Sequence, residues 1–319
     1  MARRDMARAE QGPDDQHGGV GTHQGAGNRL TWKCVSVQGR ESRYGEAGAG
    51  PTVLFLHGWG LDHKVYKRAL ARLVAAGVHV LAPALPGFGG TPALPRATTD
   101  LEGYAAWAGE FLRCVGVGEP VLAMGHSFGG GVAIKLAHDH PDQVRALVLV
   151  NSIGGSTWSH RGPRRRAMSD RPLWDWGIHF PADVLPTRQT RRVVPVIVAE
   201  ALPSLLRDPR AFWDAAGLAR RADLGSELVE LRRRRLPVVV LWGRADRLIT
   251  QDSFEDLCEA LGRPQVVTVP GAHSWLIADP DAFGEVMTNV VDIVRLAGGD
   301  AGPVSRSPDT ARSRSVEGG

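Results

Sequence analysis

A serine lies between two glycines near the middle of the chain, in a G-x-S-x-G pattern at residues 125–129 with Ser127 at its centre. The apolar run Val121–Met124 leads directly into this pattern, and the helical pattern Phe128–His140 follows it. A turn that passes so tightly from a strand to a helix leaves no room for flanking side chains, which explains the glycines. The serine would then stand at a helix amino end, where backbone N–H groups favour negative charge. This position suits a nucleophile.

A serine hydroxyl is a poor nucleophile at neutral pH unless a base accepts its proton and an acid orients that base. His273 follows the apolar run Gln265–Val269 across a Pro-Gly turn, and Asp246 follows the run Pro237–Trp242. We predict that His273 takes the Ser127 proton and passes it to the leaving group. Asp246 would fix the imidazole tautomer and stabilise the imidazolium.

Three other residues compete for these roles. His57 lies near the predicted site, and we interpret it as a structural member of the loop His57-Gly58-Trp59-Gly60. His126 also lies near the site, at the variable position of the Ser127 turn, and its side chain is predicted to line the surrounding core. Asp252 is a rival acid, but its position predicts that it caps the helix that follows it.

The elements that must position these residues form a regular alternation. Each apolar run has four to seven residues, is rich in Val and Leu, and is bounded by Gly or Pro, which is typical of strands buried on both faces of a parallel sheet. Besides the three runs above, the predicted strands are Thr52–Leu56, Val78–Ala82 and Val144–Val150. The predicted helices are Asp62–Ala76, Thr99–Val115 (with Thr98, Thr99 or Asp100 as its N-cap), Phe128–His140, Asp252–Leu261 and Pro280–Leu296. The order predicts an α/β fold, a mostly parallel, doubly wound sheet whose active site lies beyond the carboxyl ends of the strands.

Four motifs in this order give the chain a family resemblance over roughly residues 30–297. They are the loop 57–60, the Ser127 turn, the turn 243–246 and the segment 270–273. Together they resemble the α/β-hydrolase superfamily, in its capped, esterase-like serine hydrolase branch. The resemblance implies a triad in the order Ser127, Asp246, His273, with the backbone N–H groups of Trp59 and Phe128 as oxyanion donors. Many relatives have Asp where this chain has Ala84, a position that is usually structural.

The remaining segments predict the domain organisation. Residues 1–29 and 298–319 are rich in Gly and polar residues without hydrophobic periodicity, so both are expected to be disordered tails. Residues 30–151 and 237–297 form the predicted hydrolase core. Residues 152–236 contain no convincing strand and are predicted as an inserted, mostly helical cap with helices at Pro195–Arg207 and Pro209–Arg221. The cap holds four of the nine tryptophans, which indicates an apolar pocket roof. The candidate pocket residues are Trp59, His126, Trp174, Trp176 and Trp275.

Composition limits the other function classes. The net charge of +4 comes from the cap segment, where 16 arginines face 9 acidic residues. With 34 Arg against 4 Lys in the whole chain, a solvated arginine face explains this better than nucleic-acid binding, because no recognition motif accompanies it. Three widely spaced cysteines without a CxxC pair argue against a disulfide framework or a zinc cluster and predict a reducing, cytoplasmic location. No cluster of metal ligands appears in the sequence, so no metal or organic cofactor is expected. No apolar run is long enough to span a membrane.

The residues leave three functions open. We expect hydrolysis of a hydrophobic small-molecule ester through an acyl-Ser127 intermediate. The first alternative is hydrolysis of a carbon–carbon bond in a ring-fission product, with a cap arginine such as Arg188 as a substrate clamp. The second is a ligand-binding protein of the same fold that turns over slowly or not at all. Dehalogenase and epoxide hydrolase activities are disfavoured, because those relatives carry Asp where this chain has Ser127.

Overall fold

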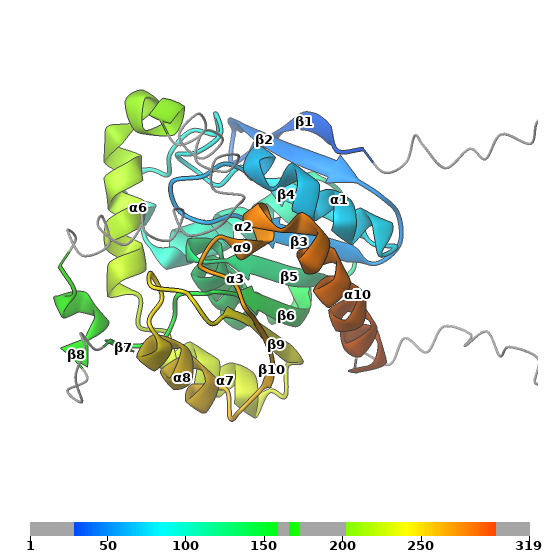
Figure 1. Cartoon of the computed structure of the whole chain (residues 1–319). Helices are drawn as coiled ribbons and strands as arrows, with labels where there is room; N and C mark the ends of the chain where they lie inside the picture. Colours follow the sequence, from blue (N-terminus) through cyan, green and yellow to red (C-terminus); the bar gives the residue numbers. More distant parts are fainter. Residues whose placement is uncertain (1–28, 159–165, 173–201, 298–319) are drawn as a thin grey trace, which may run out of the picture.

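The computed structural model describes residues 29–158, 166–172 and 202–297 of the 319-residue chain (Figure 1). Its centre is an eight-stranded sheet in the order β1-β2-β4-β3-β5-β6-β9-β10. The six strands from β4 to β10 run parallel, whereas β1 and β2 pair antiparallel with each other and β2 pairs antiparallel with β4. The strands are β1 Thr31–Val37, β2 Arg40–Ala47, β3 Thr52–Leu56, β4 His79–Pro83, β5 Val121–His126, β6 Val144–Val150, β9 Val238–Gly243 and β10 Gln265–Val269. The predicted fold class is confirmed.

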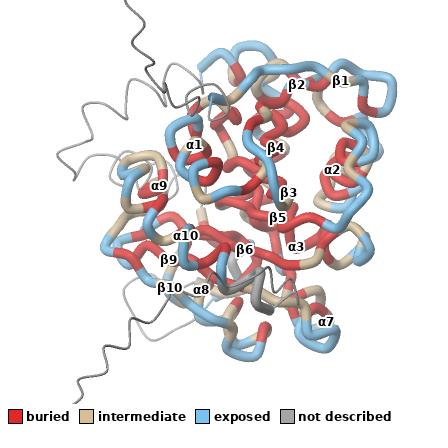
Figure 2. Tube along the Cα trace, turned by 90° about the vertical axis from the view of Figure 1, so that its right-hand side faces the viewer, coloured by how far each residue is buried: buried red, intermediate tan, exposed pale blue. Residues whose placement is uncertain are grey.

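All six predicted strands are present, three of them with the predicted bounds and three displaced by one or two residues. Strands β1 and β2 were not predicted. Strand β1 lies at the edge of the sheet and is largely exposed, and its Lys33 forms an ion pair with Glu46 of β2. Figure 2 shows the contrast between exposed β1 and the buried central strands β3, β5 and β6. In β1 polar residues interrupt the apolar ones, so the strand carries no continuous apolar run and escapes a search for one.

Helices cover both faces of the sheet, and alternation along each strand sends side chains to two cores. Along β3, Leu54 and Leu56 face one core, and Val53 and Phe55 face the other. The first core includes residues of α2, α3, α7 and α8, and the second includes residues of α1, α9 and α10. The helices are α1 Lys67–Ala75, α2 Leu101–Cys114, α3 Phe128–Asp139, α6 Pro209–Arg221, α7 Gly225–Arg233, α8 Gln251–Ala260, α9 Trp275–Ala278 and α10 Pro280–Ala297, with a 3-10 helix, η1, at His63–Tyr66.

Helix boundaries follow local capping. Asp100, one of three candidates, is the N-cap of α2, and its carboxylate accepts from the Gly103 N–H at 2.7 Å. The prediction that Asp252 caps α8 was wrong. Thr250 is the N-cap and accepts from the Ser253 N–H, so Asp252 lies in the first turn of the helix.

The predicted cap segment is only partly described. Helix α6 has the predicted bounds Pro209–Arg221, and residues 202–207 are helical, as expected from the Pro195–Arg207 prediction. The expectation of no strand was wrong, because β7 (Thr157–Trp158) pairs antiparallel with β8 (Arg166–Ala167). Helix α7, which was not predicted, packs against α3 and α8 beside the sheet. The cap boundaries stay a prediction, and the predicted tails, apart from Arg29, lie outside the described residues.

Within the described ranges, none of the helices is both long and apolar enough to cross a membrane.

Candidate active site

Ser127 occupies a strained turn between β5 and α3. Its backbone has φ 53° and ψ −117°, a conformation that non-glycine residues seldom adopt. A Cβ added to Gly125 would lie 2.2 Å from the Gly129 carbonyl oxygen, and one added to Gly129 would lie 2.2 Å from the Leu56 carbonyl oxygen. Both neighbours of Ser127 are buried, whereas Ser127 itself is partly exposed. Within the described part of the chain its hydroxyl makes no capping hydrogen bond to α3, so the turn presents that hydroxyl rather than using it as a cap.

His273 and Asp246 form a buried pair at the same edge of the sheet. The two atoms His273 Nδ1 and Asp246 Oδ2 lie 2.8 Å apart, and both residues are less than one-tenth exposed. Because an ionised carboxylate only accepts, Nδ1 carries the proton, which leaves Nε2 of a neutral ring as a proton acceptor. Asp246 Oδ1 accepts further hydrogen bonds from the N–H groups of Leu248 and Ile249, at 2.8 and 3.0 Å.

Asn151 completes the environment of this carboxylate. It follows β6 directly, has φ 44°, and donates from Nδ2 to Asp246 Oδ2 at 2.6 Å. Its Oδ1 accepts from the Trp275 indole N–H at 2.9 Å. Asn151 was not predicted as a site residue. The available signal was a polar residue, tolerant of left-handed backbone, at the carboxyl end of a central strand.

His126 connects the serine turn to the histidine loop. Its Nε2 lies 3.0 Å from the His273 carbonyl oxygen, its Nδ1 lies 2.8 Å from the Tyr66 hydroxyl, and its ring centroid is 4.9 Å from that of His273. These contacts bring His273 beside the Ser127 turn. Burial, followed by the neighbouring His273, lowers the pKa of His126 well below its ordinary value, so the ring is neutral. His126 is buried directly before Ser127 in the chain, and its predicted contact with substrate stays a prediction.

Hydrogen bonds of His57 and Gly58 fix the conformation of the loop after β3. His57 is fully buried, and its pKa is lowered to about 4 by burial. Its Nδ1 is 2.9 Å from the Gly58 carbonyl oxygen, and its Nε2 accepts from the Leu85 N–H at 2.9 Å. Gly58 N–H donates to the Tyr66 hydroxyl at 3.1 Å. The neutral His57 ring therefore shapes the loop, in agreement with its predicted structural role, and a Cβ added to Gly58, the residue before Trp59, would lie 3.3 Å from the Ser127 Cβ.

Comparison with known proteins agrees with this arrangement. The sequence profile described as the alpha/beta hydrolase family matches residues 53–286, which include all the residues discussed above. The chain belongs to the alpha/beta hydrolase family.

Named relatives of this hydrolase include esterases. The pimeloyl-[acyl-carrier protein] methyl ester esterase of Aeromonas hydrophila is 26% identical over 76% of this chain and 96% of its own length. Among solved structures, a membrane phospholipase A described as a bacterial virulence factor superposes with a TM-score of 0.66 at 25% identity, covering 84% of this chain and 87% of that one. The esterase of Exiguobacterium antarcticum shares the fold, with a TM-score of 0.65 at 18% identity over 82% of this chain and all of its own.

Aromatic side chains of the hydrolase gather over the loop after β3. The Trp59 indole N–H donates to the Phe212 carbonyl oxygen of α6 at 2.7 Å, and the two rings lie 4.6 Å apart. Phe88 and Trp213 extend this cluster, with ring distances to Phe212 of 6.4 and 5.5 Å. Trp213 is 56% exposed. We call Trp59, Phe88, Phe212 and Trp213 the aromatic cluster.

The other predicted pocket residues have different outcomes. The Trp275 ring is buried against Phe283, and its indole N–H donates to Asn151. Trp275 therefore contributes to the position of Asp246 through Asn151. Its contact with substrate stays a prediction. Trp174, Trp176 and the alternative clamp Arg188 lie outside the described residues.

The arginines of the predicted cap have mostly structural contacts where they are described. Arg233 and Arg234 both bind Glu230 on the exposed side of α7. Arg171 is only 1% exposed and donates to the carbonyl oxygens of Arg247 and Leu248, directly after Asp246. Nothing in the sequence around Arg171 distinguishes it from the other arginines, so its role could not be predicted.

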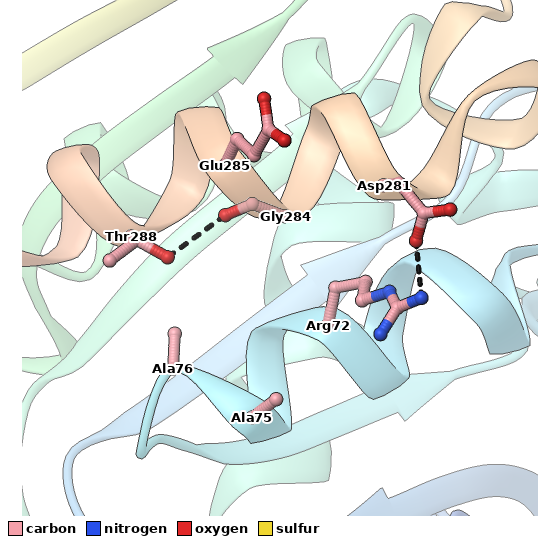
Figure 3. Close-up of a pocket in the computed structure, with 7 residues that line it drawn as sticks. All are labelled: Arg72, Ala75, Ala76, Asp281, Gly284, Glu285 and Thr288. Atoms are coloured by element: carbon pink, nitrogen blue, oxygen red, sulfur yellow. Dashed lines mark hydrogen bonds and ion pairs between the residues drawn. The ribbon is translucent and has the colours of Figure 1, made fainter.

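Two further features bear on ligands. A cavity of about 320 Å³ lies between α1 and α10, where an ion pair joins Arg72 and Asp281 (Figure 3). It contains no residue of the predicted triad. In the part of the chain that the structure describes, no group of three or more His, Cys, Asp or Glu side chains could hold a metal ion.

Proposed function

We propose that this hydrolase cleaves carboxylic esters through an acyl-Ser127 intermediate, with His273 as general base and Asp246 as its orienting acid. The observation that carries the proposal is the strained, partly exposed Ser127 beside a buried His273–Asp246 pair. Strain at a non-glycine residue persists only where the surrounding structure imposes it, and such sites gather at active centres.

The tautomer of His273 determines which of its nitrogens transfers protons in the proposed reaction. With its Nδ1 proton bound to Asp246, His273 accepts the Ser127 proton at Nε2 as Oγ attacks the ester carbonyl carbon. The same proton then passes to the departing alkoxide, which leaves as the alcohol. Water, deprotonated by His273, attacks the acyl-enzyme, and proton return to Ser127 releases the acid. Asp246 stays ionised throughout and stabilises the imidazolium.

Backbone N–H groups of Trp59 and Phe128 would stabilise the tetrahedral oxyanion. Phe128 begins α3, where helix N–H groups and the helix dipole favour developing negative charge. Trp59 lies in a loop fixed by His57 and by the Gly58–Tyr66 hydrogen bond. Each such donor is typically worth about 2.7–4 kcal/mol in the transition state.

The aromatic cluster supports a hydrophobic acyl group as the substrate's main recognition element. Apolar pockets with few polar groups bind such ligands by burying their surface. A relative matching most of this chain is named as a methyl ester esterase, which supports ester chemistry. We further propose that the enzyme acts in the cytoplasm on a small molecule and needs no metal or organic cofactor.

Fluorophosphonate labelling tests the nucleophile, and a panel of p-nitrophenyl esters of increasing acyl length tests the substrate class. We expect an adduct on Ser127, turnover that increases with acyl length, and loss of both in Ser127→Ala. In His273→Ala the adduct should form far more slowly. Ser36→Ala, on exposed strand β1, is the matched control and should behave as wild type.

The same panel separates the alternatives. Turnover of a ring-fission diketone but of no ester would move the proposal to carbon–carbon bond hydrolysis on the same triad. If the protein shows neither labelling nor turnover under conditions where a control serine esterase reacts, the ligand-binding alternative is favoured.

A further inference from the structure

One hydrogen-bonded chain of buried groups crosses the three segments that carry the proposed catalytic groups. The Gly58 N–H donates to the Tyr66 hydroxyl at 3.1 Å, and that hydroxyl lies 2.8 Å from His126 Nδ1. His126 Nε2 lies 3.0 Å from the His273 carbonyl oxygen. Tyr66, His126 and His273 are 0%, 1% and 5% exposed. We call this chain of four residues the relay.

The direction of every hydrogen bond in the relay is fixed. A backbone carbonyl oxygen only accepts, so His126 Nε2 carries the proton and donates to His273. In the neutral ring Nδ1 then accepts, and the Tyr66 hydroxyl must donate to it. The Tyr66 oxygen keeps a lone pair for the Gly58 N–H. Burial lowers the pKa of His126 and so keeps the ring in this neutral form.

The relay joins segments that are remote in sequence. Gly58 precedes Trp59 in the loop after β3, His126 precedes Ser127, and His273 follows β10. Packing around the relay is close, since a Cβ added to Gly58 would lie 2.9 Å from His126 Nδ1 and 3.3 Å from the Ser127 Cβ. Asp246 holds the His273 side chain, and the relay holds the His273 backbone. The imidazole is therefore fixed at two points.

We propose that Tyr66 and His126 are positioning residues, which hold the Trp59 loop, the Ser127 turn and the His273 loop in one mutual geometry. The proposal rests on the proposed function, in which these three segments supply an oxyanion donor, the nucleophile and the base. Neither residue touches the reacting atoms. Their effect is on the distances between the groups that do.

Tyr66→Phe is the central test, because it keeps the ring and removes the one atom that joins Gly58 to His126. We expect kcat for the best ester to fall on the order of 10- to 100-fold, since small displacements of reacting groups cost this much. KM should change little, because the aromatic cluster is untouched. His126→Gln, whose amide can donate and accept as the ring does, should retain more activity than His126→Leu.

Phe55→Leu is the matched control for lost packing. The Phe55 ring lies 4.9 Å from the Tyr66 ring in the same buried core, but Phe55 has no part in the relay. We expect it to lower the Tm while kcat stays within about twofold of wild type. A kcat loss in Phe55→Leu equal to that in Tyr66→Phe, at equal Tm, would overturn the proposal.

Amide hydrogen exchange at Gly58 supplies a readout that does not need activity. Tyr66→Phe should speed this exchange, while Phe55→Leu should not. If wild type neither hydrolyses esters nor labels at Ser127, yet Gly58 exchange speeds in Tyr66→Phe, the proposed function fails and the relay stands. Unchanged kcat in Tyr66→Phe, or unchanged Gly58 exchange, overturns the relay.

Discussion

At the scale of single residues, the hydrogen bonds to Asp246 explain how a buried carboxylate can serve as the proposed orienting acid. It accepts from His273, from Asn151 and from two backbone N–H groups. Asn151 can donate to it without adding charge. A second carboxylate in that place would alter the charge balance around the imidazole, and this difference is measurable.

Asn151→Asp should therefore shift the pH dependence of the enzyme. Asp tolerates the left-handed backbone at this position, so the fold should persist. Two carboxyl oxygens 2.6 Å apart cannot both ionise readily, so the new pair shares one proton, and only the protonated form keeps the hydrogen bond that Asn151 donates. The negative charge that the pair does gain stabilises protonated His273, so we expect the acid limb of the kcat/KM profile to move up, by at most roughly one pH unit. Asn289→Asp adds the same charge on α10, away from the site, and a profile shift equal in both variants would contradict the explanation.

At the scale of elements, the turn between β5 and α3 depends on glycines that touch backbone atoms. In Gly129→Ala the new Cβ would meet the Leu56 carbonyl oxygen, which cannot move without breaking the sheet. We expect a loss of about 3 kcal/mol in the free energy of unfolding, or failure to fold. Gly118→Ala, where no atom lies within 4 Å of the added Cβ, should stay within about 0.5 kcal/mol of wild type. Denaturant unfolding checks both, and equal losses would refute the steric argument.

Helix α6 offers a test of the aromatic cluster. Asp208 caps α6 by accepting from the Ala211 N–H at 2.9 Å, one residue before Phe212. Asp208→Ala and Asp100→Ala each remove a helix cap and should each cost about 1 kcal/mol of stability. Only Asp208→Ala loosens α6, the helix that packs on Trp59, so only this variant should raise KM for long-chain esters. A KM rise of equal size in Asp100→Ala would contradict this role for α6.

The elements differ in how far the sequence predicts them. Buried strand β6 was predicted with its bounds because six of its seven residues are apolar, Arg145 being the exception. Strand β1 was missed because polar residues interrupt its apolar ones and most of its side chains are exposed, and α7 because only Leu228 and Leu231 among its residues are buried. The Ser127, Asp246 and His273 positions followed from strand ends. Tyr66 and Asn151 were missed, because their hydrogen bonds join residues 60 and 95 positions apart and leave no local pattern.

At the scale of the whole molecule, three buried histidines make folding depend on pH. Burial lowers the pKa of His57 to about 4 and of His63 to about 3, and that of His126 lies well below its ordinary value. In the unfolded chain each of them takes up a proton near pH 6.5, whereas the folded protein keeps them neutral. The unfolded state thus binds more protons below pH 6.5, and stability must fall as the pH is lowered. Each histidine contributes about 1.4 kcal/mol per pH unit once the unfolded form is fully protonated.

His63 is the histidine that can be replaced at least cost. Among the described residues neither of its ring nitrogens has a hydrogen-bond partner, and its ring packs edge-on against Trp32. His63→Leu should therefore raise the free energy of unfolding at pH 5 by about 1–2 kcal/mol and remove about one proton from the pH slope between 6 and 5. At pH 8 the gain should be smaller, because no proton uptake is then involved. His138→Leu is the control, since the His138 imidazole is partly exposed and lies beside Asp139 rather than in the core. Denaturant unfolding at each pH measures the slope, and an unchanged slope in His63→Leu would mean that the acid sensitivity has another source.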